Sequence, residues 1–382
     1  MSIINKAAAI GGGVIGAGWV ARLLLNGIDV SIFDPDPEAS RKVGEVMKGA
    51  RRAYKQMLPD GLPKEGKLTF AKTIAEAVAD ADFIQESVPE RLDLKHKVLA
   101  EIDAHAPANA IVGSSTSGIK PTDMQVAMKK HPERLVVGHP FNPVYLLPLV
   151  EIVGGQQTFP EAIEVAKELY ASIGMKPVVV RKEIEAFVGD RLLEAAWREA
   201  LWLVKDGICT VEELDDIMRY SFGLRWAQMG MFQVYRVAGG EAGMRHFMAQ
   251  FGPCLKWPWT KLMDVPEFND DLVDLIATQS DEQAHGLSIR ELERIRDDNL
   301  VAIMEALSRQ NKGKGWGAGA LHKDYTRQLS KLAAKKAPAT APAKAKAAKP
   351  AKKAAKPAKA EKPTKAGKHA KADKAKKSKK KG

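Results

Sequence analysis

The sequence predicts an α/β protein, in which a doubly wound parallel sheet is followed by a mainly α-helical C-terminal domain. Three observations lead to this fold class. Short apolar runs alternate with helical patterns up to about residue 180, as expected for parallel strands joined by helices. A glycine-rich turn follows the first apolar run. After Glu183 the β-like runs give way to helical periodicity.

The elements can be predicted in order along the chain. Strands are expected at Ala7–Ile10, Asp29–Phe33, Asp82–Ser87, Ala110–Ser114, Leu135–Gly138, Leu149–Val153 and Pro177–Val180. Between them, helices are expected at Val14–Leu25, Leu92–Ala104 and Phe159–Ile173, with mixed, partly helical segments up to Ala79. The later helical segments are Ala186–Val204, Val211–Tyr220, Gly230–Phe251 and Asn269–Gln310.

The glycine-rich turn has the pattern of a dinucleotide-binding loop. Its sequence, which fits G-x-G-x-x-G, is Gly11-Gly12-Gly13-Val14-Ile15-Gly16. In such a loop the first glycine permits the turn, the second lets the backbone approach a pyrophosphate, and the third lets helix and strand pack closely. The phosphates would lie at the helix N-terminus, among free N–H groups. A glycine turn that merely packs is the alternative, but the flanking strands and helix favour a Rossmann-type domain.

An acidic residue follows the second expected strand. Asp34 lies 18 residues after Gly16, where a carboxylate can accept hydrogen bonds from the adenosine ribose hydroxyls. It would repel a 2′-phosphate, and no Arg follows it, because the next residues are Pro35-Asp36-Pro37. The sequence therefore predicts NAD as the cofactor rather than NADP.

Among the eight histidines, His139 has the most suggestive position. It follows an apolar strand, and ligands of open parallel sheets bind outside the C-terminal strand ends. A histidine there can remove the proton of an alcohol while the hydride leaves to nicotinamide. Glu151, 12 residues later, is a candidate partner that would fix the tautomer. Taken alone, the two residues could also be a structural loop histidine and a surface acid on an edge strand.

The chain from residue 6 to about 325 resembles the L-3-hydroxyacyl-CoA dehydrogenase family. The glycine loop is one shared motif, but the stretch with His139 and the trailing Glu151 is more specific to the family. The other matching segments are Ser87–Glu90, Ser115–Ser117, Gly138–Pro143, Leu149–Val153 and Phe187–Leu193.

The resemblance implies roles for several residues. His139 would be the general base and Glu151 its orienting partner. Ser117 would hydrogen-bond the substrate hydroxyl, and Glu90 with Lys95 would lie near the cofactor. Without the resemblance, Ser117 would be an ordinary turn residue, and Glu90 and Lys95 a solvated salt bridge of little energetic value.

One position departs from the acyl-CoA pattern, in which an Asn stands where this chain has Asp190. An ionised Asp only accepts hydrogen bonds, so the role of the Asn does not carry over. The added charge could favour a cationic substrate, or it could pair with Arg191. The resemblance is strongest to family members that oxidise L-carnitine, a small β-hydroxy acid with a quaternary ammonium group, and implies this substrate.

A quaternary ammonium cannot donate a hydrogen bond, so its site is expected to use aromatic faces. Five of the seven tryptophans lie between residues 197 and 259. The candidate substrate residues are Phe141, Asn142, Asp190, Phe222, Arg225 and Trp226. The alternative is that these aromatic residues are core and that Arg225 forms a surface salt bridge.

The charge is concentrated in the last fifty residues. Nineteen Lys and two acids give them a net charge of +17, which leaves about −5 for the rest of a chain whose total is +12. We therefore predict a Rossmann domain over residues 1–184, a helical substrate and dimerisation domain over 185–330 and a disordered Lys/Ala/Pro-rich tail over 331–382. An alternative function from another class is non-specific binding of nucleic acid or another polyanion through the tail.

The remaining expectations concern partners and location. The resemblance implies a homodimer formed through the helical domain. We expect a cytoplasmic protein, since no secretion signal or membrane-spanning run is evident. We expect no metal site, because Cys209 and Cys254 lack the spacing of metal ligands.

Overall fold

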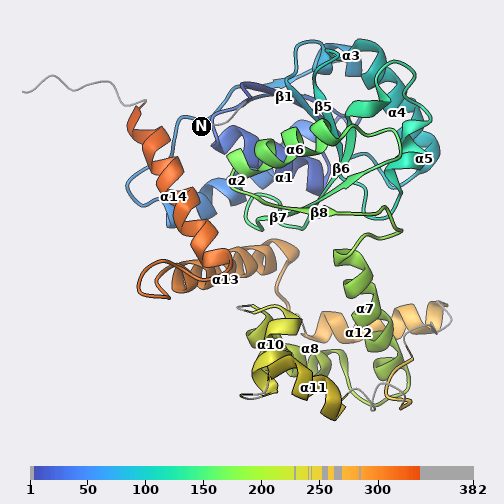
Figure 1. The fold of residues 1–382 in the computed structure, drawn as a ribbon, viewed down its shortest axis with the longest axis vertical. Helices are drawn as coiled ribbons and strands as arrows, with labels where there is room; N and C mark the ends of the chain where they lie inside the picture. Colours follow the sequence, from blue (N-terminus) through green and yellow to red (C-terminus); the bar gives the residue numbers. More distant parts are fainter. Residues whose placement is uncertain are drawn as a thin grey trace, which may run out of the picture. The chain divides into compact units, whose positions relative to one another are not determined.

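The computed structural model describes residues 4–227, 229–239, 241, 243–251, 257–261, 269–283 and 285–335. It contains an eight-stranded sheet with the strand order β3-β2-β1-β4-β5-β6-β7-β8 (Figure 1). The strands are β1 (Lys6–Ile10), β2 (Asp29–Phe33), β3 (Leu68–Phe70), β4 (Phe83–Glu86), β5 (Ile111–Ser114), β6 (Leu135–Pro140), β7 (Leu149–Gly154) and β8 (Lys176–Val180). The order of the first six is that of a dinucleotide-binding Rossmann sheet.

Helices cover both faces of this sheet, as the predicted doubly wound fold requires. They are α1 (Val14–Leu25), α2 (Ala39–Met57), α3 (Ile74–Val78), α4 (Leu92–His105), α5 (Pro121–Gln125) and α6 (Pro160–Ser172). Helices α1, α2 and α6 contribute to one buried apolar cluster, and α3, α4 and α5 to the other. Along β1, Ala7 and Ala9 face the first cluster, whereas Ala8 and Ile10 face the second, as the alternation of a strand requires.

The sheet departs from the predicted parallel arrangement at one place. Strands β6 and β7 are antiparallel, while every other neighbouring pair is parallel. Residues 141–148 connect the two strands, and this is too short for the crossover of a dozen or more residues that parallel strands need. As a result, His139 and Glu151 are direct partners in the β6–β7 register.

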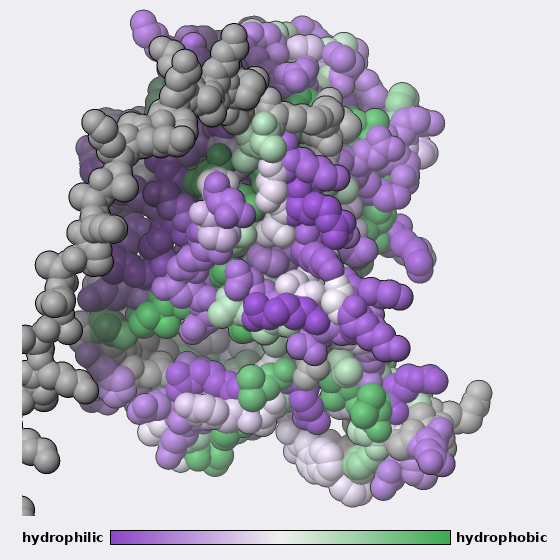
Figure 2. All heavy atoms as spheres, turned by 90° about the vertical axis from the view of Figure 1, so that its left-hand side faces the viewer, coloured by the Kyte–Doolittle hydropathy of each residue, from purple (hydrophilic) through white to green (hydrophobic). Residues whose placement is uncertain are grey.

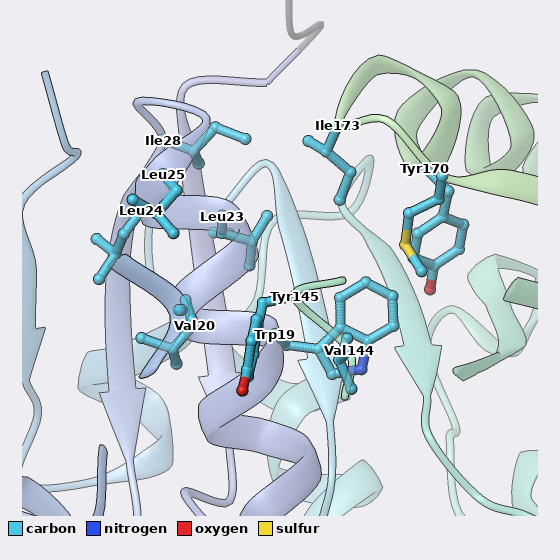
Figure 3. Close-up of a cluster of buried hydrophobic side chains, with 14 of the residues drawn as sticks. Trp19, Val20, Leu23, Leu24, Leu25, Ile28, Val144, Tyr145, Tyr170 and Ile173 are labelled. Carbon is cyan, nitrogen blue, oxygen red and sulfur yellow. The ribbon is translucent and has the colours of Figure 1, made fainter. Parts of the chain in front are cut away.

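Helix α1 packs against the residues between β6 and β7 and holds them in place (Figure 3). The buried Arg22 guanidinium donates to the carbonyl oxygens of Val144, Ile173 and Leu147 at 2.7, 3.0 and 3.2 Å. Trp19 lies beside Tyr170, with ring centroids 5.4 Å apart. The core of the first domain therefore also holds the loop that follows His139.

The predicted helical region that follows the sheet is confirmed. It consists of more and shorter helices than predicted. The helices are α7 (Gly189–Lys205), α8 (Val211–Tyr220), α9 (Phe222–Trp226), α10 (Met231–Ala238), α11 (Gly243–Phe251), α12 (Asp270–Gln283), α13 (Ile289–Ser308) and α14 (Ala318–Lys335). The start of α8 and the start of α13 carry capping boxes, in which Thr210 pairs with Glu213 and Ser288 with Glu291. The predicted disordered tail begins too early, because α14 continues through residues 331–335. Residues 336–382, on which the rest of the predicted tail falls, lie outside the described residues.

Four of these elements were not predicted, namely β3, α5, α9 and α14. Strand β3 has three residues at the edge of the sheet, which is too short for a clear alternation. Helix α14 follows a glycine-rich turn and packs against α1 and α2. Its Tyr325 hydroxyl accepts a hydrogen bond from Asn26 at 2.7 Å and lies 2.8 Å from the hydroxyl of Tyr54.

Among the described residues, no helix combines the length and the apolar composition needed to cross a membrane. The face shown in Figure 2 is largely hydrophilic, and its hydrophobic residues gather mainly in the lower part of the view.

Candidate active site

The glycine-rich loop after β1 packs tightly on one side and is open on the other. Gly11 has a φ of +100°, and a Cβ atom there would lie 2.6 Å from the carbonyl oxygen of Ser87. A Cβ atom at Gly16 would lie 1.9 Å from the carbonyl oxygen of Gly11, so α1 can approach the strand only with glycine there. At Gly13 an added Cβ would meet no atom within 4 Å. The backbone at Gly13 is therefore open to a ligand, and the binding of a phosphate there stays a prediction.

A cavity of about 550 Å³ lies beside this loop. Its lining includes Gly11, Gly13, Val14, Ile15, Phe33 and Asp34. The volume is in the usual range for cofactor sites, roughly 300–1,000 Å³. Apolar walls, the N-terminus of α1 and one carboxylate are the groups that a dinucleotide needs, so the residues present fit it.

Asp34, directly after β2, belongs to this cavity. Its Oδ2 accepts a hydrogen bond from the backbone N–H of Gly12 at 2.5 Å, and its Oδ1 accepts one from that of Asp36 at 2.8 Å. A carboxylate oxygen can accept more than one hydrogen bond, so both oxygens can still receive ribose hydroxyls. The ribose contact itself stays a prediction.

Lys95, predicted to pair with Glu90, has a second and closer acidic partner. Its Nζ lies 2.9 and 3.2 Å from the two carboxylate oxygens of Glu86 and 3.5 Å from Glu90. Lys95 is 1% exposed and Glu86 is fully buried. The lysine is therefore part of a buried ion pair behind the cofactor cavity, and the alternative of a solvated salt bridge is wrong.

Glu90 connects this pair to the turn that contains Ser117. Its Oε1 accepts hydrogen bonds from the backbone N–H groups of Ser117 and Gly118, both at 3.1 Å, and from the hydroxyl of Thr116. Burial raises the pKa of Glu90, but these hydrogen bonds and the charge of Lys95 outweigh it and lower the pKa below its usual value. Glu90 thus fixes the backbone of the Ser117 turn.

His139 and Glu151 form the buried centre of the site. The His139 Nδ1 atom lies 2.9 Å from Oε2 of Glu151, and both residues are about 3% exposed. The β6–β7 hairpin places them opposite each other, which the 12-residue separation alone could not indicate. The alternatives of a loop histidine and a surface acid are wrong, because both side chains are buried and paired.

The second oxygen of Glu151 is held by the start of α7. Its Oε1 accepts hydrogen bonds from the backbone N–H groups of Val188 and Gly189 at 3.1 and 3.0 Å. Burial raises the pKa of Glu151, but the hydrogen bonds from His139, Gly189 and Val188 outweigh this and lower the pKa below its usual value. An ionised Glu151 favours a proton on Nδ1 of His139 and leaves Nε2 free to accept one.

Asp190, also on α7, lies on the other side of the imidazole. Its Oδ2 is 3.6 Å from Nε2 of His139. Burial raises its pKa above the usual 3.8, and the carboxylates of Glu151 and Glu194 add to this, although His139 and the Ser117 hydroxyl oppose it. The structure thus brings Ser117, His139, Glu151 and Asp190 into one cluster.

Two aromatic rings enclose His139. The rings of Phe141 and Phe187 have centroids 4.9 and 5.7 Å from its imidazole. Phe187 is fully buried, and both it and Ala186 have left-handed backbones, with φ of 46° and 59°. Such conformations are strained for residues other than glycine and persist where the surroundings enforce them. This turn places the first residues of α7 next to Glu151.

The remaining predicted substrate residues lie apart from this cluster. Asn142 lines a separate cavity of about 350 Å³ between α2 and α13. On α9, the rings of Phe222 and Trp226 are 4.7 Å apart, and Arg225 lines a cavity of about 170 Å³. Within the described parts of the chain, no hydrogen bond, ion pair or ring contact joins these α9 residues to His139.

Comparison with known families agrees with this geometry. Residues 6–184 match the profile described as 3-hydroxyacyl-CoA dehydrogenase, NAD binding domain. Residues 187–265 match the C-terminal domain of 3-hydroxyacyl-CoA dehydrogenase. The chain belongs to the 3-hydroxyacyl-CoA dehydrogenase family. This family member is an oxidoreductase, and its first domain binds NAD.

Curated relatives of this family member carry a more specific name. An L-carnitine dehydrogenase of Mesorhizobium japonicum is 95% identical over 336 residues, which are 88% of this chain and 92% of that protein. An L-carnitine dehydrogenase of Pseudomonas putida is 54% identical over 313 residues, 82% of this chain and 97% of that protein. Among solved structures, the FHMPC 5-dehydrogenase, an NAD+-dependent dismutase, is 29% identical, with a TM-score of 0.65 over 80% of this chain and 98% of its own.

Sequence reasoning missed several members of the site in this dehydrogenase. Glu86 could have been noticed as an acid at the end of a strand that begins with the apolar residues Phe83 and Ile84. Phe187, Val188 and Gly189 lie in a segment that matched the family, but their contacts with His139 and Glu151 were not predicted, because these contacts depend on the left-handed turn before α7.

Proposed function

We propose that this protein oxidises the hydroxyl group of L-carnitine to the ketone of 3-dehydrocarnitine, with NAD as the hydride acceptor. The observation that carries the reaction type is the buried His139–Glu151 pair, whose geometry suits a general base for an alcohol. The substrate rests on the similarity to proteins named L-carnitine dehydrogenase, one of which is 95% identical over 88% of this chain.

The proposed roles follow from the contacts. Nε2 of His139 takes the hydroxyl proton of the substrate, and Glu151 stabilises the resulting imidazolium from Nδ1 at 2.9 Å. Ser117, whose hydroxyl is a hydrogen-bond partner of Asp190, orients the substrate hydroxyl. Gly11–Gly16 and Asp34 hold the pyrophosphate and the ribose of NAD. A bound NAD would supply the acceptor for the hydride that leaves the substrate carbon bearing the hydroxyl.

The direct test is NADH production by the purified full chain. L-carnitine should support turnover with NAD, whereas 3-hydroxybutyryl-CoA and small uncharged β-hydroxy acids should react at least tenfold less efficiently, judged by kcat/KM. A preference for the acyl-CoA substrate would move the protein to the acyl-CoA branch of its family and refute the proposal.

We also propose that the chain forms a homodimer through its helical part. Leu192, Leu193 and Trp197 on α7 are each more than half exposed, which is unusual for large apolar side chains so close together. Light scattering should give twice the mass of one chain. Leu193→Glu should give a single-chain mass at the same concentration, and an unchanged mass would exclude this face.

A second candidate function is binding of polyanions by the C-terminal tail. The observation that favours it is the net charge of +17 in the last fifty residues, beside a mildly acidic remainder. A chain that ends at Lys335, the last residue of α14, should keep its NADH production and lose retention on DNA at low salt. Equal retention of both chains would eliminate this function.

A further inference from the structure

The carboxylate of Asp190 lies next to the position that a reacting substrate must occupy beside His139. His139 has two ring nitrogens, and Glu151 occupies Nδ1. The other nitrogen, Nε2, is the one that takes the hydroxyl proton under the proposed function. Asp190 Oδ2 is 3.6 Å from Nε2, and its side chain is 25% exposed. Asp190 therefore borders the position of the substrate hydroxyl and is still open to a ligand.

Among the described residues, no cation other than His139 forms an ion pair with Asp190. Arg191 could have done so, but its guanidinium donates to the carbonyl oxygen of Glu185 at 3.4 Å. The pairing of Asp190 with Arg191 that the sequence left open is therefore not made.

The charges around Asp190 are unbalanced. The nearby ionisable groups that act on it are His139 and the carboxylates of Glu151 and Glu194, and both carboxylates disfavour its ionised form. When His139 is neutral and ready to accept a proton, this side of the site carries negative charge without a positive partner. A ligand with a positive charge would remove the imbalance, whereas an uncharged ligand would not.

The covalent structure of a γ-ammonium β-hydroxy acid matches this arrangement. The hydroxyl oxygen and the ammonium nitrogen are on adjacent carbons, roughly 3–4 Å apart in staggered conformations. A hydroxyl that donates to Nε2 lies roughly 2.8 Å from it. With Asp190 also 3.6 Å from Nε2, the ammonium nitrogen can lie within about 4–6 Å of the carboxylate, where opposite charges attract strongly at partly buried sites.

We propose that Asp190 is the specificity residue that selects a cationic substrate, by facing the quaternary ammonium group while the hydroxyl contacts His139. The proposal rests on the proposed function, because it assumes a β-hydroxy acid at His139. A quaternary ammonium cannot donate a hydrogen bond, so the carboxylate of Asp190 recognises it by charge alone. The same carboxylate disfavours an uncharged acyl chain at that position, because it would lose water and gain no partner.

The test compares two substrates of equal shape. L-carnitine carries a quaternary nitrogen, and 3-hydroxy-5,5-dimethylhexanoate carries a quaternary carbon in the same place. Asp190→Asn should lower the ratio of kcat/KM for L-carnitine to kcat/KM for the carbon analogue by roughly 10- to 100-fold. Where turnover of the analogue is too slow, its inhibition constant against L-carnitine replaces kcat/KM.

A matched control lies on the same helix. Glu199→Gln removes the same charge nine residues further along α7, roughly 14 Å away along the helix axis, and should leave the ratio of the two substrates within twofold. Asp190→Glu, which keeps the charge, should keep more of the preference for L-carnitine than Asp190→Asn does. Equal losses on both substrates would show that Asp190 acts on His139 or on the fold, and would overturn the proposal.

The outcome also separates this proposal from the proposed function. If the unmodified enzyme oxidises L-carnitine and Asp190→Asn leaves the substrate ratio unchanged, the role of Asp190 is refuted and the proposed function stands. If the unmodified enzyme produces no NADH with L-carnitine, both are refuted. NADH binding and the thermal midpoint of each variant show whether it has folded.

Discussion

The two sides of the site differ in how the chain builds them. The cofactor side is one continuous stretch, in which β1, the glycine loop, α1, β2 and Asp34 follow each other within residues 6–34. The side around His139 joins three separate segments, since His139 is on β6, Glu151 on β7 and Asp190 on α7. A local motif can therefore indicate the first side, whereas the second exists only after a hairpin and a helix start have come together.

The largest expected effect is on the side of the site that contains His139. His139→Gln should lower kcat by roughly 10³- to 10⁴-fold, because an amide cannot replace the imidazole Nε2 as the base that takes the substrate proton. NADH affinity, measured by fluorescence titration, should stay within threefold, because the cofactor loop does not depend on the imidazole. Retained turnover would refute the assignment of the base, and lost NADH binding would show that the two sides are not independent.

Glu151→Gln should have nearly as large an effect, for a reason that the structure supplies. The N–H groups of Val188 and Gly189 would hold the amide oxygen, so the NH₂ group would face Nδ1 of His139. This forces the ring proton onto Nε2, where it blocks proton acceptance, and kcat should fall by roughly 10³-fold. Glu151→Asp, which keeps the charge, should lose less. A smaller loss for Gln than for Asp would contradict the tautomer argument.

The same variant has a predicted pH dependence. The pKa of Glu151 is lower in the folded protein than its usual 4.5, since burial is outweighed by its hydrogen bonds. Its ionised form therefore stabilises the fold above pH 4.5, and this contribution is lost as the pH falls through the lowered pKa. The difference in free energy of unfolding between the unmodified protein and Glu151→Gln, measured with urea, should be larger at pH 7 than at pH 4. An equal difference would contradict the shift.

The difference between the two sides also explains what the sequence could predict. Helix α1 and strand β2 have the predicted bounds, because glycine, apolar periodicity and the acid at the strand end are all local signals. The antiparallel pairing of β6 with β7 was not predicted, because the direction of a strand depends on its neighbour. The left-handed backbone at Phe187 is equally invisible, since a phenylalanine gives no hint of a positive φ. His139 was found from its position, but its surroundings were not.

The glycine loop offers a sharper comparison within the cofactor side. Gly16→Ala should lower the thermal midpoint by several degrees, because its Cβ would lie 1.9 Å from the carbonyl oxygen of Gly11. Gly13→Ala meets no atom within 4 Å, so its midpoint should be unchanged while NADH affinity falls by roughly 10-fold, as the methyl group takes the space of the pyrophosphate. Unchanged NADH affinity for Gly13→Ala would place the phosphates elsewhere.

The last expected effect on the cofactor side is at Asp34. Asp34→Ala should weaken NAD binding by roughly tenfold through loss of ribose hydrogen bonds, and it should raise the relative efficiency with NADP. Part of this loss comes from the Gly12 N–H, which would lose its acceptor at 2.5 Å. Asp34→Asn keeps an acceptor for Gly12 but removes the charge. It should therefore lose less NAD affinity than Asp34→Ala, while its efficiency with NADP should still be higher than that of the unmodified protein.

Asp36→Ala is the control, because it removes a neighbouring acid whose side chain forms an ion pair with Lys42. It should change the affinity for neither NAD nor NADP. Equal NAD affinity in all three variants would show that the ribose is held by other groups, and the strongest local motif of the sequence would then explain only the phosphates.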